Sequence, residues 1–259
     1  MYFKVKDETE IYYEYDGKGE PLVFIHGLGA SSEMYNPQVE YFKKFFKVIL
    51  IDLRGNGKSG KLDCSVDKVL DKQMEDIKEL LQTLEIEQAI FVGVSYGGVL
   101  IQKLAITYPD IVKAIVISDS FCDTTIDSLQ KRIAMFGANQ TWVLQMPKKW
   151  LAKLTKASYK NWILASQEME KVMLNLRKEE TILQRRAINN IKFNKALETL
   201  NKPILCIVGN HTKLGIQMMK QISDITNTEL RIIEDSFDPS NLCQPKVFNG
   251  IVHNFLLKL

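Results

Sequence analysis

Residues 89–98 read Ala-Ile-Phe-Val-Gly-Val-Ser-Tyr-Gly-Gly, an apolar run that ends in a serine with a glycine two positions away on each side. The run has the length and composition of a strand that is buried on both faces. The residues after Ser95 have the pattern of a helix that continues to about Tyr108 and stops at Pro109. Glycines at this spacing are typical of a strained strand-to-helix turn that is packed closely on both sides. We therefore expect Ser95 to lie on a sharp turn at the end of a central strand.

Other apolar runs resemble the one before Ser95, and helical patterns separate most of them. Short continuous runs of this kind are typical of strands that are covered on both faces of a parallel sheet. Strands and helices in alternation predict an α/β fold with a doubly wound, mostly parallel sheet and right-handed crossovers. The further runs are residues 21–25, 46–52, 113–119, 203–209 and 230–233.

Residues 121–202 interrupt this alternation. They contain no convincing strand, and they include long helical patterns at 148–159 and 159–176. We predict one core formed by residues 1–120 and 203–259, with residues 121–202 inserted as a helical cap.

Composition excludes several classes of protein. The chain has 259 residues, of which 46% are hydrophobic and 25% charged, and its net charge of +3 gives no reason to expect a nucleic-acid partner. No leader and no apolar run of membrane-spanning length is recognised, so we expect a cytoplasmic protein without a membrane partner. The four cysteines are scattered without metal-ligand spacing, and we expect reduced thiols and no metal.

Charge is unevenly distributed along the chain. Residues 130–202 contain 15 Lys and Arg but only 5 Asp and Glu, a net charge of +10, which leaves 19 − 26 = −7 for the rest. The cations are spread along the helical patterns, which favours solvated helix faces. Attraction of an anionic ligand or partner to the cap remains the alternative.

Two further motifs precede the serine turn. His26-Gly27-Leu28-Gly29 follows the run at 21–25, and residues 52–59, Asp-Leu-Arg-Gly-Asn-Gly-Lys-Ser, follow the run at 46–52. The three motifs, in this order at successive strand ends, resemble the α/β-hydrolase superfamily, and specifically its small, capped, esterase- or lipase-like branch. The resemblance covers almost the whole chain.

This resemblance implies a set of roles around the serine. Ser95 would be the nucleophile, and the backbone N–H groups of Leu28 and Tyr96 would form the oxyanion hole. The motif histidine is structural in this family, which implies a structural role for His26. Members hydrolyse small esters, thioesters or lactones by acyl transfer, with no metal and no organic cofactor.

The chain departs from the family at the two partners of the serine. The family's acid follows the next-to-last strand, three residues after a glycine, and that position is Thr212 here. The family's histidine lies after the last strand, a few residues before Gln-Pro, and that position is Asp238 here. A serine hydroxyl without a base is a poor nucleophile, so we expect activity to be impaired or altered.

Several explanations of this departure remain open. In the first explanation, the acid and base have exchanged loops, so that His211 and Asp238 serve Ser95 from swapped positions. Alternatively, the site is degenerate and now binds a ligand or partner. In a third explanation, altered chemistry survives, with Asp238 acting through a water or Asp119 substituting as the acid. A deliberate double substitution of a competent parent is the fourth.

Other candidate residues lie in the cap and in the last helical pattern. We expect Trp142 and Met146 to face Ser95 and to favour an apolar group of the substrate. His253 lies among apolar residues of the last helical pattern and is interpreted as a helix-face residue.

The function predicted from these motifs is that of a serine ester or lactone hydrolase of low activity, with acyl transfer at Ser95 and a small apolar ester, lactone or related ligand. The alternative is a catalytically degenerate protein on the same scaffold, with a small-molecule-binding or regulatory function. An interaction module that uses the basic cap has the least support. Nothing in the sequence indicates an oligomeric state.

Overall fold

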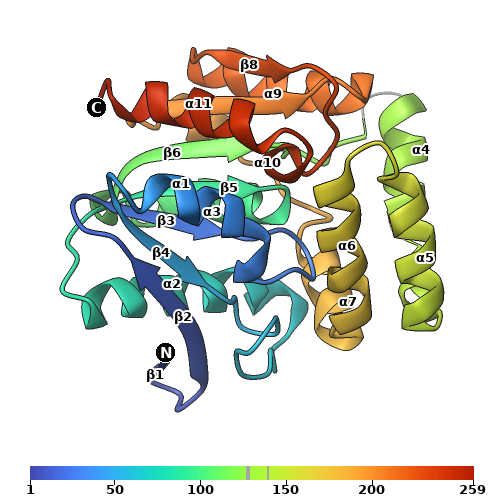
Figure 1. Ribbon diagram of the computed structural model, residues 1–259, viewed down its shortest axis with the longest axis horizontal. Helices are drawn as coiled ribbons and strands as arrows, with labels where there is room; N and C mark the ends of the chain where they lie inside the picture. Colours follow the sequence, from blue (N-terminus) through green and yellow to red (C-terminus); the bar gives the residue numbers. More distant parts are fainter. Residues whose placement is uncertain (127–128, 139) are drawn as a thin grey trace.

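The computed structural model describes residues 1–126, 129–138 and 140–259, and within 129–138 only some of the side chains. Its centre is a single eight-stranded sheet in the order β1-β2-β4-β3-β5-β6-β7-β8 (Figure 1). The strands are β1 (Tyr2–Lys4), β2 (Glu10–Asp16), β3 (Pro21–Ile25), β4 (Lys47–Ile51), β5 (Ala89–Val94), β6 (Val112–Ser118), β7 (Ile204–Gly209) and β8 (Leu230–Ile233).

The sheet is antiparallel at one edge and parallel elsewhere. β2 pairs antiparallel with both β1 and β4, and all the other pairs are parallel. In the interior Val23 lies opposite Ile49 on one side and Phe91 on the other. Every residue of β5 and β7 is buried, as the continuous apolar runs predict.

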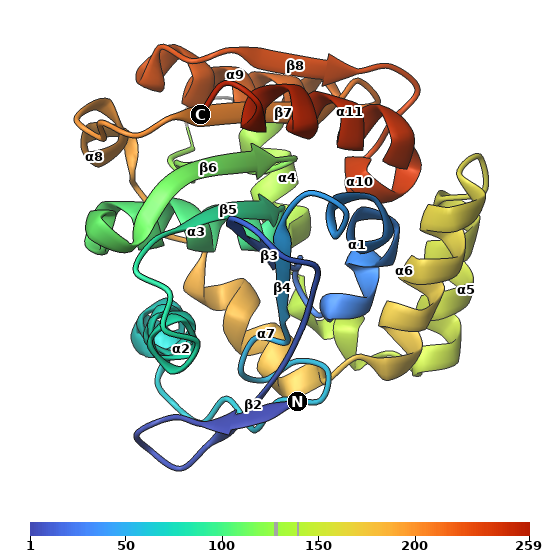
Figure 2. The ribbon, with the colours of Figure 1, turned by 60° about the vertical axis from the view of Figure 1, so that its left-hand side comes forward.

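Helices cover both faces of the sheet. Figure 2 shows α1 (Asn36–Phe42) and α11 (Pro245–Leu256) on one side of the strands, and α2 (Val69–Thr83) and α3 (Tyr96–Thr107) on the other. Buried side chains of α9 (Lys213–Thr226) join the cluster formed by α2 and α3. The predicted doubly wound, mostly parallel sheet is therefore confirmed.

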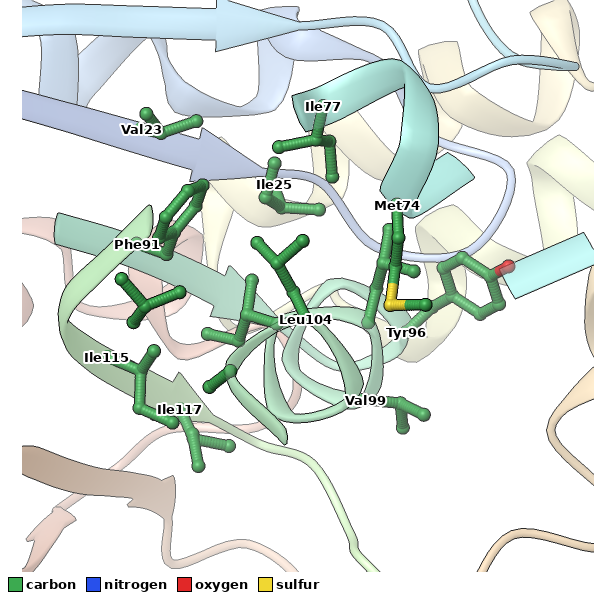
Figure 3. Close-up of a cluster of buried hydrophobic side chains, with 14 of the residues drawn as sticks. Val23, Ile25, Met74, Ile77, Phe91, Tyr96, Val99, Leu104, Ile115 and Ile117 are labelled. Carbon is green, nitrogen blue, oxygen red and sulfur yellow. The ribbon is translucent and has the colours of Figure 1, made fainter. Parts of the chain in front are cut away.

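The serine turn is fixed by the packing of α3 on the sheet. Val99, Leu100, Ile101 and Leu104 are fully buried, so this helix is apolar almost all round. Figure 3 shows Val99 and Leu104 of α3 in the same cluster as Met74 and Ile77 of α2 and strand residues such as Ile25 and Phe91. The end of β5 and the start of α3 are thus held from two sides.

A helical segment connects β6 to β7. It contains α4 (Leu129–Ala138), α5 (Lys148–Ser158), α6 (Ile163–Asn175), α7 (Lys178–Ala187) and α8 (Asn194–Glu198). The described part of this segment has no strand, only an isolated bridge between Asp123 and Lys192. Figure 1 shows α4, α5, α6 and α7 grouped at one end of the sheet, with α5 outermost. We refer to these helices as the cap.

Short helices complete the structure. The four-residue helix α10 (Ser240–Cys243) precedes α11 and packs against α6 of the cap. Four 3-10 helices occupy loops, namely η1 (Ser32–Tyr35), η2 (Val66–Lys68), η3 (Pro109–Ile111) and η4 (Thr141–Gln145). Among the helices described, none is both long and apolar enough to cross a bilayer.

Candidate active site

Ser95 lies on a strained turn between β5 and α3. Its backbone has φ of +54° and ψ of −114°, which a residue with a side chain rarely adopts. The surrounding structure holds this conformation through hydrogen bonds on both sides. The Ser95 N–H donates to the carbonyl of Ser118 at 2.8 Å, and the Ser120 hydroxyl donates to the carbonyl of Ser95 at 2.8 Å. The sequence-based expectation of a sharp turn at Ser95 is confirmed.

The glycines on either side of Ser95 are required by close backbone contact. A Cβ atom on Gly97 would lie 2.1 Å from the Ile25 carbonyl oxygen, and one on Gly93 would lie 2.5 Å from the Gly97 carbonyl oxygen. Both contacts are with backbone, which cannot rotate away. The two glycines therefore let α3 begin directly against the ends of β3 and β5.

Two backbone N–H groups are available beside Ser95. Tyr96 is the first residue of α3, where a helix leaves its N–H groups without partners inside the helix. Within the described residues, no hydrogen bond from the N–H of Leu28 or of Tyr96 is found. Both residues line the cavity that contains Ser95. The roles predicted for Leu28 and Tyr96 in an oxyanion hole remain a prediction that this arrangement accommodates.

His26 supports the loop that carries Leu28. Its ring is fully buried, its Nε2 accepts a hydrogen bond from the Leu53 N–H at 3.0 Å, and its Nδ1 lies 2.8 Å from the Gly27 carbonyl oxygen. Because Leu53 must donate, Nδ1 carries the proton of a neutral ring. Burial lowers the pKa of His26, which also favours this neutral form. His26 thus joins the ends of β3 and β4 and takes no part in the chemistry.

Asp238, at the position where the resemblance predicts the family's histidine, lines the same two cavities as Ser95. The Ser95 hydroxyl acts on its carboxyl group and lowers the pKa of Asp238. The loop is held from the cap, since the Tyr159 hydroxyl donates to the Asp238 carbonyl oxygen at 2.5 Å. A carboxyl group is therefore the polar side chain directly available to the serine hydroxyl.

Asp119 lies behind Asp238 and is held by four hydrogen bonds. The backbone N–H groups of Gly209 and Ser240 donate to it at 3.0 and 2.8 Å. The hydroxyls of Ser240 and Ser118 donate at 2.8 and 2.9 Å. Its backbone has a positive φ of +49° directly after β6. Four donors on one carboxyl group favour its charged form.

The two carboxyl groups influence one another. Burial raises the pKa of Asp238 well above its ordinary value, and the neighbouring charge of Asp119 raises it further. Burial also raises the pKa of Asp119, but its hydrogen-bond donors act in the opposite direction. For Asp238 the Ser95 hydroxyl lowers the pKa, but burial and the charge of Asp119 outweigh it, so the neutral form of Asp238 is favoured.

The other two histidines lie away from Ser95. The exposed ring of His211 packs edge-on against Trp162 and Phe237, with ring centroids 5.2 and 5.3 Å apart. His253, on α11, packs against the ring of Phe45 at 4.8 Å. Within the described residues, no hydrogen bond joins His211 to Ser95 or Asp238. The swapped arrangement of His211 and Asp238 gains no support from this geometry.

Thr212, at the family's acid position, caps a helix. It is the N-cap of α9, and its hydroxyl accepts a hydrogen bond from the Gly215 N–H at 3.2 Å. Thr212 also lines the larger cavity at Ser95. Its hydroxyl therefore has a structural partner, and the acidic group nearest to Asp238 is Asp119.

Ser95 and Asp238 lie between two cavities of different size. The larger, of about 420 Å³, extends under the cap and over α9 and is mostly apolar. The smaller, of about 90 Å³, lies on the side of η1 and α6. Leu28, Ser95 and Asp238 line both cavities, so a carbonyl group placed at Ser95 would have one substituent in each.

The cap residues that line these cavities differ from those expected. Arg185 and Ile188 reach the larger cavity, and Tyr159 and Met169 reach the smaller one. Burial lowers the pKa of Arg185. Trp142 is 64% exposed on the surface, with its indole bonded to Gln140 at 2.9 Å.

Neither cavity at Ser95 has Trp142 or Met146 in its lining. The cavities are lined instead by four other residues, which are Tyr159, Met169, Arg185 and Ile188. The sequence signal for them was weak, because it was only their position in helical patterns.

A search of the described residues finds no group of three or more His, Cys, Asp or Glu side chains arranged to hold a metal ion. Three of the four cysteines are buried. The polar groups at Ser95 include its own hydroxyl, the carboxyl groups of Asp119 and Asp238, and the backbone N–H groups of Leu28 and Tyr96.

Comparison with known proteins agrees with this geometry. The family model of the α/β hydrolase fold matches residues 20–241. The chain belongs to the α/β-hydrolase family. This membership explains the order of the three motifs, the strained serine and the helical segment between β6 and β7.

Two curated relatives are hydrolase-family proteins. An (E)-2-((N-methylformamido)methylene)succinate hydrolase from Acinetobacter baylyi is 36% identical over 111 residues, which are 43% of this α/β-hydrolase and 41% of that protein. The AB hydrolase superfamily protein YisY from Bacillus subtilis is 26% identical over 83% of this chain and 82% of its own length. The match to the first relative thus spans less than half of it.

Two solved structures share the fold over their whole length. A thermophilic esterase from Thermogutta terrifontis has a TM-score of 0.84 at 19% identity, covering 100% of this chain and 98% of its own. The enol-lactonase from Burkholderia xenovorans has a TM-score of 0.80 at 22% identity, covering 99% of this chain and 100% of its own. At these identities the likeness establishes the fold alone.

Proposed function

We propose that this α/β-hydrolase binds a small apolar ester or lactone at Ser95 and transfers its acyl group slowly to the serine, with Asp238 as the base. The observation that carries the proposal is that Ser95 and Asp238 together line both cavities, with the serine hydroxyl acting on the pKa of the Asp238 carboxyl group. A relative named as an (E)-2-((N-methylformamido)methylene)succinate hydrolase supports a carbonyl compound as substrate.

The proposed reaction begins when Asp238 is ionised. Its carboxylate accepts the hydroxyl proton as Ser95 Oγ attacks the carbonyl carbon. The N–H groups of Leu28 and Tyr96 stabilise the negative oxygen that forms. The ester C–O bond then breaks, and the departing alkoxide takes the proton from Asp238. Water hydrolyses the acyl-serine by the same proton transfers and restores the starting state.

The raised pKa of the proposed base, Asp238, accounts for the low activity. A carboxyl group of raised pKa is largely protonated at pH values below that pKa, and in that form it cannot accept the serine proton. The carboxylate fraction that remains is a stronger base than an ordinary aspartate, because its pKa is higher. The protein is therefore proposed to be a slow enzyme whose rate depends on the ionisation of Asp238.

The alternative is a binding protein that has lost turnover. It is favoured by one observation, which is that none of the three imidazole rings lines either cavity at Ser95. In this case the cavities hold a small molecule and Ser95 remains because the turn is part of the fold.

One experiment separates the two functions. The intact protein is incubated with p-nitrophenyl acetate, and mass spectrometry follows acetylation of Ser95 while absorbance follows p-nitrophenol release. We expect slow acetylation and slow release, both absent in Ser95→Ala. A folded protein that gives no acetyl adduct, but binds the unreactive ketone acetophenone, would establish the binding function instead.

A further inference from the structure

We propose that the outer face of α5 docks this protein on anionic lipid membranes. The inference concerns a surface of the cap and is independent of any chemistry at Ser95. It replaces the expectation of no membrane partner, and it takes up the alternative that the basic cap attracts an anionic partner.

The two faces of α5 differ sharply. Leu151 and Ala152 are buried, and the helix packs against α6 on that side. Trp150 and Leu154 lie one turn apart on the other side, and they are 65% and 57% exposed. Both views show α5 as the outermost helix of the cap, with α6 between it and the core (Figures 1 and 2). The outer face therefore places two large apolar side chains in water.

Exposed lysines lie on α5 and directly after it, and Lys149 and Lys153 are next to Trp150 and Leu154 in the sequence. Lys148, Lys149, Lys153 and Lys160 are all exposed. Within the part of the chain that the structure describes, none of these four is found in an ion pair. Lys156 is paired with Glu170 of α6 at 2.7 Å. From Gln140 to Gln167 the sequence contains five lysines and no acidic residue. The face thus has an uncompensated positive charge.

The chemistry of this face fits an anionic bilayer. A basic helix with tryptophan and leucine on one side is typical of helices that lie in the membrane interface. Tryptophan favours the headgroup level, and lysines near a bilayer are attracted to anionic lipid headgroups. The face is the convex side of a helix flanked by long, flexible lysines, which suits a flat partner.

A second copy of the chain is a poorer partner for the same face. A symmetric contact between two copies would place the α5 lysines of one protomer against those of the other. Like charges brought together in this way oppose association. The rest of the chain carries a net charge of −7, so the cap is the side that an anionic surface attracts.

Docking through α5 would place the candidate active site one helix from the membrane. Tyr159 follows directly after α5, and its hydroxyl bonds to Asp238. Met169 of α6, the helix behind α5, lines the smaller cavity. The docked cap would therefore hold the cavities close to molecules that partition into the bilayer.

Vesicle flotation tests the proposal on the full chain. Vesicles of phosphatidylcholine alone are compared with vesicles that also contain phosphatidylglycerol, at low and high salt. The variants are Trp150→Ala with Leu154→Ala, and Lys149→Gln with Lys153→Gln. The matched control is Lys44→Gln with Lys246→Gln, two exposed lysines of the core. Circular dichroism establishes that each variant is folded.

We expect binding to the phosphatidylglycerol vesicles only, weakened by salt and unchanged in the core control. Each α5 variant should lose about tenfold or more in affinity. Equal binding to both kinds of vesicle, or α5 variants that behave like the core control, would overturn the proposal. A folded wild-type protein that binds neither kind of vesicle would also overturn it. This includes the case in which light scattering shows that the protein forms a dimer through α5.

Discussion

The charge of the buried Asp119 carboxylate acts on the carboxyl group of Asp238 and raises its pKa. Hydrogen bonds from Gly209, Ser240 and Ser118 hold the carboxyl group of Asp119 in place. An oriented acid behind the group that contacts the serine is the arrangement of a catalytic triad. We propose that Asp119 is such an acid and that the carboxyl group of Asp238 stands where a triad has its imidazole.

This relationship predicts that a single substitution restores a triad. Asp238→His should place an imidazole between Ser95 and Asp119, and it should raise the rate of p-nitrophenyl acetate hydrolysis by about 10²–10⁴-fold. Thr212→Asp, at the position where the resemblance predicts the family's acid, should add little, because the charge of Asp119 already acts on residue 238. The measurement is kcat/KM for each variant at neutral pH.

The control for this restoration is Asp119→Asn in the Asp238→His background. Loss of the gain in that double variant would assign the acid's role to Asp119. If instead the gain survives there and requires Thr212→Asp, the acid acts from the α9 cap and the role of Asp119 described above is wrong.

The wild-type rate should increase with pH. Burial and the charge of Asp119 raise the pKa of Asp238, and only the carboxylate can accept the serine proton. Below that pKa, kcat/KM should therefore increase by about tenfold for each pH unit. The assay uses p-nitrophenyl acetate, with Ser95→Ala subtracted for hydrolysis by the solvent. A rate that is flat with pH, or the same profile in Asp238→Asn, would exclude Asp238 as the base.

Sequence motifs predicted the strands, the strained turn and the glycines because these features depend on neighbours along the chain. The influence of Asp119 on Asp238 depends on two loops that are far apart in the sequence, and only the folded sheet, with β7 between β6 and β8, brings these loops to the same edge. Both residues were candidates from the sequence, but the effect of one carboxyl group on the other could not be predicted from it.

In the cap, too, the sequence predicts the helices but not which of their residues face the cavities. Its helical patterns were recognised from the sequence, but the choice of Met169 over Trp142 as a lining residue depends on how α6 is fixed to the core. Tyr159 bonds to the Asp238 carbonyl oxygen and the Trp162 indole bonds to the Asp235 carbonyl oxygen at 2.8 Å. Such contacts set which face of α6 points inward, and helical periodicity alone does not reveal it.

Asp238 should lower the stability of the protein at neutral pH. A carboxyl group whose pKa is raised by folding keeps its proton in the folded state while the unfolded chain loses it. Stability therefore decreases as the pH rises from about 4, the unfolded pKa, to the raised pKa of the folded state. Asp238→Asn removes this penalty and should stabilise the protein by about 1.4 kcal/mol for each pKa unit of the shift.

Urea unfolding at several pH values measures this effect. The gain in free energy of unfolding from Asp238→Asn should be small near pH 4 and largest at neutral pH. Asp224→Asn serves as the control, because Asp224 is an exposed residue of α9. A gain that does not change with pH would show that the carboxyl group of Asp238 is not the cause.

The unequal cavities predict selectivity for a short chain on one side of the carbonyl group. The acyl group stays bound after the alcohol departs, so we assign it to the smaller cavity of about 90 Å³. The alcohol then leaves through the larger cavity of about 420 Å³. Acetylation of Ser95 by p-nitrophenyl acetate should therefore be faster than acylation by the butyrate or octanoate ester.

Met169→Ala tests this assignment because Met169 closes the smaller cavity from α6. It should raise the rate with the octanoate ester roughly tenfold relative to the acetate ester. Met173→Ala is the matched control, since Met173 lies one turn further along α6 and lines neither cavity at Ser95. Binding of acetophenone and octanophenone, measured by calorimetry, reports the same selectivity without requiring turnover. Identical chain-length profiles in the two methionine variants would assign the acyl group to the larger cavity.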